Sequence, residues 1–197
     1  MRPALAGLAL AAALLAGAPA PAQAHEGALT RFVRASTRAL DGGAVALDVL
    51  STCSLPRTAS MQVIAQLDLN HDARFDAMET ALAEAMLGDR ADLGLRVEIA
   101  EAPTAPTTRQ VAVQVDVEGK HVSIAVLSTF TAPAPAPARF GVQFAGPGEP
   151  LSFAVSTPPG LTLAGPTQAE LVAGAPALRF EVRPASPATS APPSGIP

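Results

Sequence analysis

Oxygen-bearing side chains recur at alternate positions in one short acidic segment of the chain. Within residues 68–79, positions 1, 3, 5, 7, 9 and 12 of a twelve-residue loop are occupied by Asp68, Asn70, Asp72, Arg74, Asp76 and Glu79. Ca²⁺ is a hard cation that takes six to eight oxygen ligands at about 2.3–2.6 Å, and a short loop can surround it when alternate residues point inward. The spacing therefore predicts a site for one Ca²⁺ ion.

The positions within this loop predict distinct roles for their residues. The first three would bind the ion through side-chain oxygens, and Arg74 would bind it through its backbone carbonyl while its side chain turns outward. Asp76 would act directly or through a water molecule, and Glu79 would contribute both carboxylate oxygens. A solvated acidic turn is the alternative reading of the same segment.

This pattern resembles the loop of the EF-hand family, and the resemblance covers residues 58–88, with a helical pattern on either side. It implies a helix-loop-helix unit in which Phe75 packs between the helices. The family places Gly at position 6, where this chain has Ala73. A left-handed backbone there costs a non-Gly residue about 1–2 kcal/mol. We therefore expect a weak site, with a dissociation constant of about 10⁻⁴–10⁻³ M or modestly tighter.

EF-hand loops usually occur in pairs, and the sequence contains one such loop. A single loop favours a structural or buffering ion over a conformational sensor.

The first 24 residues have the features of a secretory signal peptide. Arg2 is followed by an apolar run over residues 5–15, and residues 22–24 read Ala-Gln-Ala, the small-x-small pattern of a cleavage site. The apolar run is shorter than the roughly 20 residues that a membrane span needs. We expect cleavage after Ala24 and a secreted or periplasmic protein, with no membrane span after cleavage.

Cleavage at this site would leave His25 at the amino terminus, where its amino group and imidazole could chelate Cu²⁺. An exported copper- or nickel-handling protein is therefore an alternative function. The layout of the chain, with a terminal His, two strands, an acidic loop and further strands, is also similar to the external region of HupE/UreJ-type membrane proteins. A third alternative is a structural or adhesion β module without a functional ion.

Composition argues against several other classes of protein. The formal net charge is −4, the 13 Lys and Arg residues are scattered, and Trp and Tyr are absent, so a nucleic-acid-binding role is not expected. Cys53 is the single cysteine, which rules out a disulfide within the chain and favours a buried thiol on a strand. The chain contains no Gly-x-Ser-x-Gly and no His-Glu-x-x-His motif, and we expect a non-enzyme, with an unidentified protein as a possible partner.

The rest of the chain predicts a mainly β fold. Period-two alternation and Gly- or Pro-rich turns predict strands at residues 29–40, 44–51, 93–99, 111–117, 122–126, 140–145, 151–156, 161–164 and 178–182. Helical spacing predicts helices at residues 61–67, with an N-cap among residues 58–60, and at residues 78–87, which end at Gly88.

We expect one antiparallel β-sandwich domain over residues 25–183 that carries the EF-hand-like insert at residues 58–88. The Ala-Pro segment at residues 132–138 could be a connection within one sandwich or a linker between two domains, and one sandwich is favoured. Residues 184–197 are rich in Pro and poor in apolar residues, which predicts a disordered tail.

Overall fold

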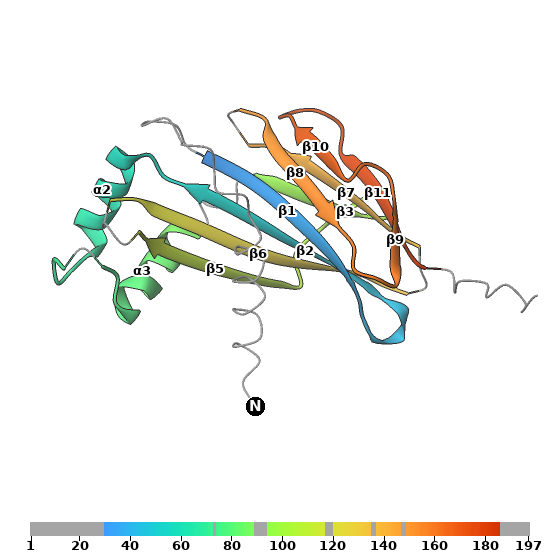
Figure 1. The fold of residues 1–197 in the computed structure, drawn as a ribbon, viewed down its shortest axis with the longest axis horizontal. Helices are drawn as coiled ribbons and strands as arrows, with labels where there is room; N and C mark the ends of the chain where they lie inside the picture. Colours follow the sequence, from blue (N-terminus) through green and yellow to red (C-terminus); the bar gives the residue numbers. More distant parts are fainter. Residues whose placement is uncertain are drawn as a thin grey trace, which may run out of the picture.

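The computed structural model describes residues 30–72, 74–88, 94–116, 120–134, 137–146 and 149–185. These residues form two β-sheets and two α-helices, with the helices at one end of the molecule (Figure 1). The predicted signal peptide, His25 and Ala73 lie outside the described residues. So does the predicted tail, except for Pro184, which ends the last strand, and Ala185.

The larger sheet has six strands, and its centre is formed by the first two strands of the fold. In spatial order it contains β10 (Gln168–Leu171), β8 (Leu151–Ser156), β1 (Thr30–Ala39), β2 (Val45–Ser54), β6 (Val122–Ala132) and β5 (Thr108–Val115). The smaller sheet has five strands: β4 (Ala102–Thr104), β3 (Leu95–Ile99), β7 (Ala138–Phe144), β11 (Leu178–Pro184) and β9 (Leu161–Ala164).

Two pairs of predicted strands that follow one another in the sequence form hairpins in the six-stranded sheet. β1 pairs with β2 in antiparallel fashion around a turn, η1 (Asp41–Gly43), where Gly42 and Gly43 have φ angles of 75° and 82°. Positive φ angles of this kind favour Gly, which explains why an Asp-Gly-Gly sequence marks the turn. β5 pairs with β6 in the second hairpin.

The expectation of an entirely antiparallel sandwich is wrong at one pair of strands. β1 and β8 are parallel, with Val33 opposite Phe153 and Ala35 opposite Val155. A tight hairpin requires antiparallel strands, but β8 follows β7 of the other sheet. The chain therefore crosses from the five-stranded sheet to the six-stranded sheet before β8 pairs with β1. A connection of this kind allows β8 to run in either direction relative to β1.

Two short edge strands, β4 and β10, were not predicted. Both lack the alternation of large apolar residues that identifies the other strands, and β4 contains a proline, which an edge strand tolerates.

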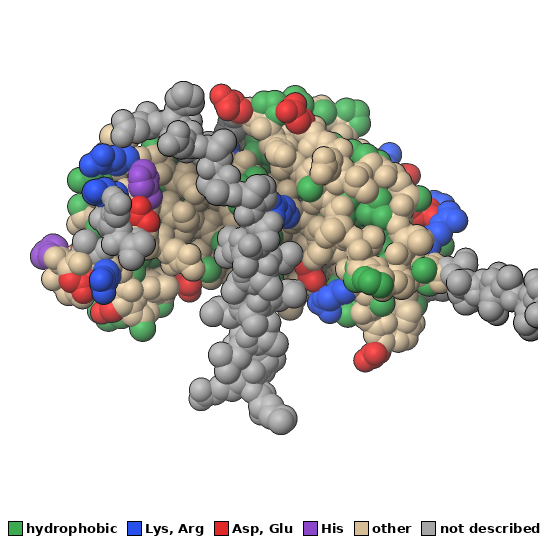
Figure 2. Space-filling model, in the orientation of Figure 1, with side chains coloured by type: hydrophobic (Ala, Val, Ile, Leu, Met, Phe, Trp, Pro, Cys, Tyr) green, Lys and Arg blue, Asp and Glu red, His purple; other side chains and the backbone are tan. Residues whose placement is uncertain are grey.

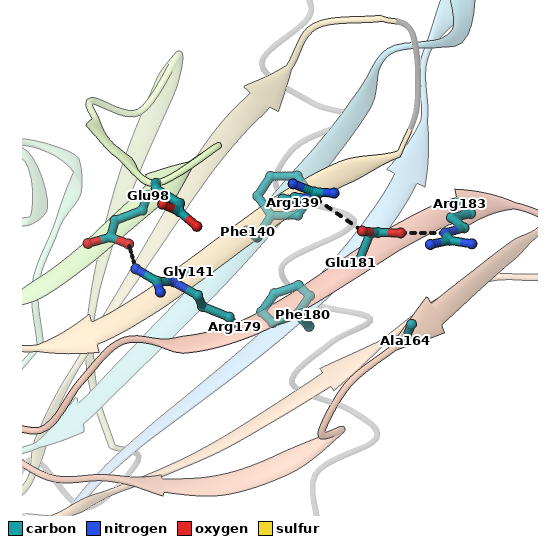
Figure 3. Close-up of a pocket in the computed structure, with 10 residues that line it drawn as sticks. Glu98, Arg139, Phe140, Gly141, Ala164, Arg179, Phe180, Glu181 and Arg183 are labelled. Atoms are coloured by element: carbon teal, nitrogen blue, oxygen red, sulfur yellow. Dashed lines mark hydrogen bonds and ion pairs between the residues drawn. The ribbon is translucent and has the colours of Figure 1, made fainter.

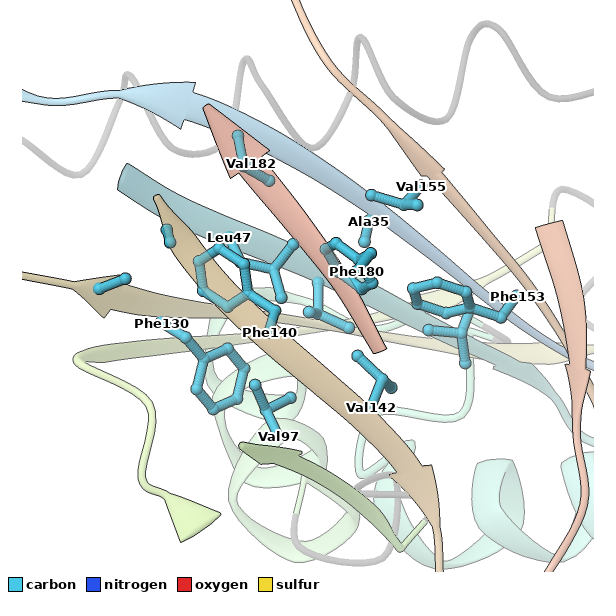
Figure 4. Close-up of a cluster of buried hydrophobic side chains, with 14 of the residues drawn as sticks. Ala35, Leu47, Val97, Phe130, Phe140, Val142, Phe153, Val155, Phe180 and Val182 are labelled. Atoms are coloured by element: carbon cyan, nitrogen blue, oxygen red, sulfur yellow. The ribbon is translucent and has the colours of Figure 1, made fainter. Parts of the chain in front are cut away.

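The two sheets pack face to face around a core that contains five of the chain's seven Phe residues. Phe140 and Phe180 lie with their ring centroids 5.8 Å apart, and Phe153 lies 6.3 Å from Phe180 (Figure 4). We call this cluster the sandwich core. Its buried members also include Val33, Leu47, Val49, Val97, Phe130, Val142, Phe144, Leu151 and Val182.

The two helices, α2 (Arg57–Leu67) and α3 (Ala77–Leu87), cover the other end of the same face of the six-stranded sheet (Figure 1). Along β6, Val122, Ile124 and Val126 contact the helix side, whereas Phe130 and Ala132 contact the five-stranded sheet. These residues are an even number of positions apart and so point to one face of the strand. The helices thus take the place of the second sheet over this end.

The cluster under the helices, which we call the helix core, contains Ile64, Leu67, Ala83, Leu87, Val113, Val122, Ile124 and Val126. Neither helix of the described part of the chain has the length and apolar character needed to cross a membrane.

Candidate functional site

The predicted calcium loop lies between the two helices, and α2 leads into it. The helix begins at Arg57 after Pro56, so the prediction of an N-cap among residues 58–60 is wrong. Ser60 is instead fully buried, and its hydroxyl accepts a hydrogen bond from Val122 N at 2.9 Å and donates one to Leu55 O at 3.1 Å. This serine fastens the helix that precedes the loop to strand β6.

The second helix begins with a reciprocal pair of hydrogen bonds at its amino terminus. The Asp76 carboxylate accepts from Met78 N at 2.8 Å and from Glu79 N at 2.9 Å, and the Glu79 carboxylate accepts from Asp76 N at 2.9 Å. This arrangement is a capping box, in which the first and fourth residues satisfy each other's exposed amides. Loop positions 9 and 12 therefore also fix where α3 starts, and the helix ends at Gly88 as predicted.

Glu79 is the most buried residue of the candidate site, with 1% of its surface exposed. While its Oε2 serves the capping box, its Oε1 accepts from Leu69 N at 2.6 Å and from Asn70 N at 3.2 Å. Burying a carboxylate is costly unless hydrogen bonds compensate, and here three backbone amides do so. One side chain thus joins the beginning of the loop to its end.

The other loop oxygens turn toward amides of the loop itself. Asp72 N donates to Asp68 Oδ1 at 3.2 Å and to Asn70 Oδ1 at 3.0 Å, and Arg74 N donates to Asp72 Oδ1 at 2.8 Å. Asp68 is buried, whereas Asn70, Asp72, Arg74 and Asp76 are exposed. The side chains at positions 1 and 3 therefore both accept from the amide at position 5.

The backbone of the loop has a left-handed residue at position 4, where His71 has a φ angle of 62°. The prediction placed such a residue at position 6, Ala73, which lies outside the described residues. Phe75, at position 8, is half-buried and packs against the helix core.

The loop residues are of the chemical types that bind a hard cation, but their side chains are not arranged around a common point. Five of them carry side-chain oxygens, and the sixth, Arg74, is exposed and offers a carbonyl. Within the described ranges, however, no three or more Asp, Glu, His or Cys side chains are grouped closely enough to hold a metal ion. Their oxygens bond loop amides instead, and an ion would have to compete with these bonds.

The histidine and cysteine side chains of the described residues join no cluster that could hold a metal ion. His71 and His121 are exposed, and the histidine side chains in view lie at the end of the molecule that carries the helices (Figure 2). Cys53 is buried on β2, as the sequence predicts, and burial raises the pKa of its thiol. A raised pKa keeps the thiol protonated near neutral pH and so less reactive.

The outer surface of the five-stranded sheet carries a shallow groove of about 340 Å³ that the sequence analysis did not single out. Its charged side chains pair with one another (Figure 3): Arg179 Nη2 with Glu98 at 3.4 Å and Arg139 Nε with Glu181 at 3.2 Å across strands, and Arg183 with Glu181 along β11. The alternation of charges at 179, 181 and 183 was the available signal. Mutually paired exposed charges of this kind define a solvated face rather than a reactive one.

Comparison of the chain with family models, with curated proteins and with solved structures finds no match.

Proposed function

We propose that this protein is an exported calcium-binding protein and that residues 68–79 hold one Ca²⁺ ion. The side chains of Asp68, Asn70, Asp72, Asp76 and Glu79 would supply oxygen ligands, together with the backbone carbonyl of Arg74. The role is binding rather than catalysis, and the ion would be structural or buffering.

The burial of Glu79 is the observation that carries this proposal. A capping box needs one carboxylate oxygen at the helix terminus, and an exposed glutamate can provide it. Glu79 is instead buried, with its second oxygen among the first amides of the loop. A carboxylate at position 12 that already reaches position 2 is placed where a loop of this length closes around a cation.

The proposed role of the ion follows from where the loop is attached. Both helices contribute to the helix core, and Ser60 ties α2 to β6. An ion between the helices would therefore hold them together on the sheet. Binding must turn several carboxylates away from loop amides, and this competition accords with a weak site of about 10⁻⁴–10⁻³ M.

Calorimetric titration of Ca²⁺ into the purified protein, with Mg²⁺ as the control ion, tests the proposal. We expect one-to-one binding of Ca²⁺ and much weaker binding of Mg²⁺, which demands a tighter octahedral geometry. If neither heat nor a shift in melting temperature is seen at millimolar Ca²⁺, the proposal fails.

An isosteric variant locates the site. Asp72→Asn removes one charge but keeps an oxygen that can accept from Arg74 N, so the loop should keep its fold. We expect it to weaken Ca²⁺ binding by about tenfold or more, or about 1.4 kcal/mol. Glu170→Gln, which removes an exposed carboxylate on β10, is the matched control and should leave binding unchanged. If both variants weaken Ca²⁺ binding equally, the ion is attracted by the overall negative charge of the protein and not by this loop.

Export is tested separately by sequencing the amino terminus of the protein recovered outside the cytoplasm. A chain that begins at His25 would support cleavage after Ala24, and one that begins at Met1 would contradict it.

A further inference from the structure

Strand β2 of the six-stranded sheet is buried on both of its faces. Nine of its ten residues are buried, and successive side chains of a strand point to opposite faces. Leu47 and Val49 belong to the sandwich core, so Ala46, Leu50 and Thr52 point to the outer face, away from the five-stranded sheet and the helices. These three residues are 0%, 1% and 7% exposed. A strand that is buried on both faces must be covered on both.

The buried part of the outer face extends from β2 onto β6. Leu127 is paired with Leu50, points to the same face and is 7% exposed. We call Ala46, Leu50, Thr52 and Leu127 the outer strip. Among the described residues, neither leucine belongs to the sandwich core or to the helix core. The hydroxyl of Thr52 is buried without a hydrogen-bond partner in the described part of the chain, as on a surface that another segment has closed off from water.

The described elements do not supply the cover of the outer strip. On β1, Arg34 is paired with Leu50, but its guanidinium lies over the ring of Phe32, 5.6 Å from the ring centroid. Farther out on the same face, Gln110 of β5 and Ser152 of β8 are exposed. The five-stranded sheet and both helices pack against the opposite face. The covering atoms therefore belong to residues outside the described ranges.

The outer strip also lacks the composition of a sheet face that meets water. On the outer surface of the five-stranded sheet, the side chains of Arg139 and Arg179 are 69% and 60% exposed and pair with carboxylates (Figure 3). On the outer strip, two leucines and an alanine occupy the central strands instead. A contiguous apolar group of this kind marks a surface of contact.

We propose that the amino-terminal segment of the same chain packs over the outer strip, with the apolar run at residues 5–15 in contact with it. This run contains five leucines and no charged residue. β1 begins at Thr30, which pairs with Ser54 at the end of β2, so the segment before it starts next to the outer strip. The 14 residues between the run and Thr30 can span about 46 Å when extended, more than twice the roughly 20 Å length of the strip.

The other segments outside the described ranges are poor candidates for this cover. The internal gaps are one to five residues long and join elements at the ends of the strands. Residues 186–197 contain four prolines and one large apolar residue, Ile196. Residues 25–29 contain one large apolar residue, Leu29. The apolar run is the segment whose composition matches the two leucines of the outer strip, because only apolar groups gain free energy by covering them.

Cleavage after Ala24 would remove this cover and leave the outer strip open to water or to a partner. This consequence rests on the proposed function, in which the first 24 residues act as a signal peptide. The cover itself is a property of the uncleaved chain and depends neither on export nor on Ca²⁺.

Thiol labelling of the uncleaved chain tests the cover. Cell-free translation without membranes leaves residues 1–24 in place. Leu50→Cys should react with a maleimide roughly tenfold or more slowly than Ser152→Cys, which is exposed on the same face of the sheet. The native Cys53 is buried and is present in both variants. Equal labelling rates of the two variants would overturn the proposal.

Charges introduced into the chain identify the covering segment. Leu8→Asp with Leu10→Asp should raise the labelling rate of Leu50→Cys toward that of Ser152→Cys, because carboxylates in the apolar run oppose burial. Thr189→Asp with Ser190→Asp adds the same charge to the carboxyl-terminal tail and is the matched control, which should leave the rate unchanged. A rate that does not respond to the charges at residues 8 and 10 contradicts the proposal. Circular dichroism of each variant verifies its fold.

Photocrosslinking shows whether the contact lies within one chain. A benzophenone amino acid in place of Leu10 should form crosslinks to β2 or β6, which mass spectrometry locates. A mixture with isotopically labelled protein separates crosslinks within a chain from those between two copies. Crosslinks only between copies, or only to other parts of the protein, would overturn the proposal.

Labelling of the protein recovered outside the cytoplasm separates the cover from the export proposal. If that protein begins at His25, Leu50→Cys should react as fast as Ser152→Cys, and slow labelling would contradict the cover by residues 5–15. If it begins at Met1, cleavage in the proposed function is wrong, and slow labelling of Leu50→Cys would still support the cover.

Discussion

The two ends of one face of the six-stranded sheet are covered by different means. Over one end, the five-stranded sheet supplies an apolar layer in which five Phe residues are buried. Over the other end, the helices supply smaller aliphatic residues, and the nearby helix and loop residues Ser60, Asp68 and Glu79 are buried polar groups. The sandwich core is therefore held mainly by burial of large side chains, whereas the helix end also depends on hydrogen bonds to buried polar groups.

This difference shows how one sheet can carry a rigid half and an adjustable half. Large apolar side chains packed at high density allow few alternative arrangements. A buried carboxylate that bonds backbone amides can exchange those partners for a cation without loss of the apolar contacts beneath it.

The largest effect should come from Phe140→Ala in the sandwich core. Phe140 is 1% exposed and contacts Phe180, so its truncation leaves a cavity and should destabilise the protein by about 3–5 kcal/mol. Denaturant unfolding followed by circular dichroism measures the loss. If the loss is below about 1 kcal/mol, this core is less tightly packed than its burial indicates.

Glu79→Ala should have the next largest effect, and that effect should be local. The substitution removes the acceptor for the amides of Leu69, Asn70 and Asp76, and hydrogen bonds to charged groups contribute about 1.5–3 kcal/mol. Amide hydrogen exchange should show faster exchange across the loop and the first turn of α3, while amides of β7 and β11 keep their protection. Uniformly faster exchange would contradict the division into two halves.

Ser60→Ala should destabilise the protein less than Glu79→Ala, because it removes a neutral hydroxyl and not a charged group. The variant leaves Val122 N and Leu55 O without their side-chain partner in a buried place, which costs about 1–2 kcal/mol. Ser123→Ala is the matched control, since its hydroxyl bonds Ser54 at 3.1 Å in an exposed position, and it should change stability by less than about 0.5 kcal/mol. Thermal unfolding of the two variants side by side measures the difference, and equal losses would argue against the role given to Ser60.

The smallest effect should come from the charged outer surface of the five-stranded sheet. The hydrogen bond from Arg183, with a further one from Arg139, lowers the pKa of Glu181 below its ordinary value. A carboxyl whose pKa is lower in the folded state contributes stability above its unfolded pKa and loses it as the pH falls through the folded pKa. Melting curves recorded below the ordinary carboxyl pKa of about 4.5 should therefore show a slightly smaller decline for Glu181→Gln than for the parent protein. A steeper decline in the variant would reverse the sign of this interaction.

Much of the fold could be predicted from local patterns. Alternating residues such as Val97, Val142 and Val182 identify strands whose inner face is buried, and the Asp-Gly-Gly turn identifies the first hairpin because two left-handed residues are needed there. The same local reasoning places the two helices and the end of α3 at Gly88. It could not find β4 and β10, because short edge strands need no alternation of apolar residues.

Part of the candidate site was predictable for the same reason. The spacing of oxygen-bearing residues in the loop and the place of Phe75 depend on positions close in sequence. The hydrogen bonds of Ser60 could not be predicted, because Val122, its partner on β6, lies far along the chain.

The sequence by itself determined most of the strands, both helices and the first hairpin turn, and it showed which loop carries closely spaced oxygen-bearing side chains, because those properties depend on neighbours within about one turn or one strand. Tertiary structure alone decided that β8 runs parallel to β1, that the helices replace the second sheet over one end of the first, and that the carboxylate of Glu79 is buried while Met78, Leu82 and Met86 of the same helix are exposed. These outcomes depend on which distant segments meet, and burial is set by the whole packed molecule rather than by any stretch of its chain.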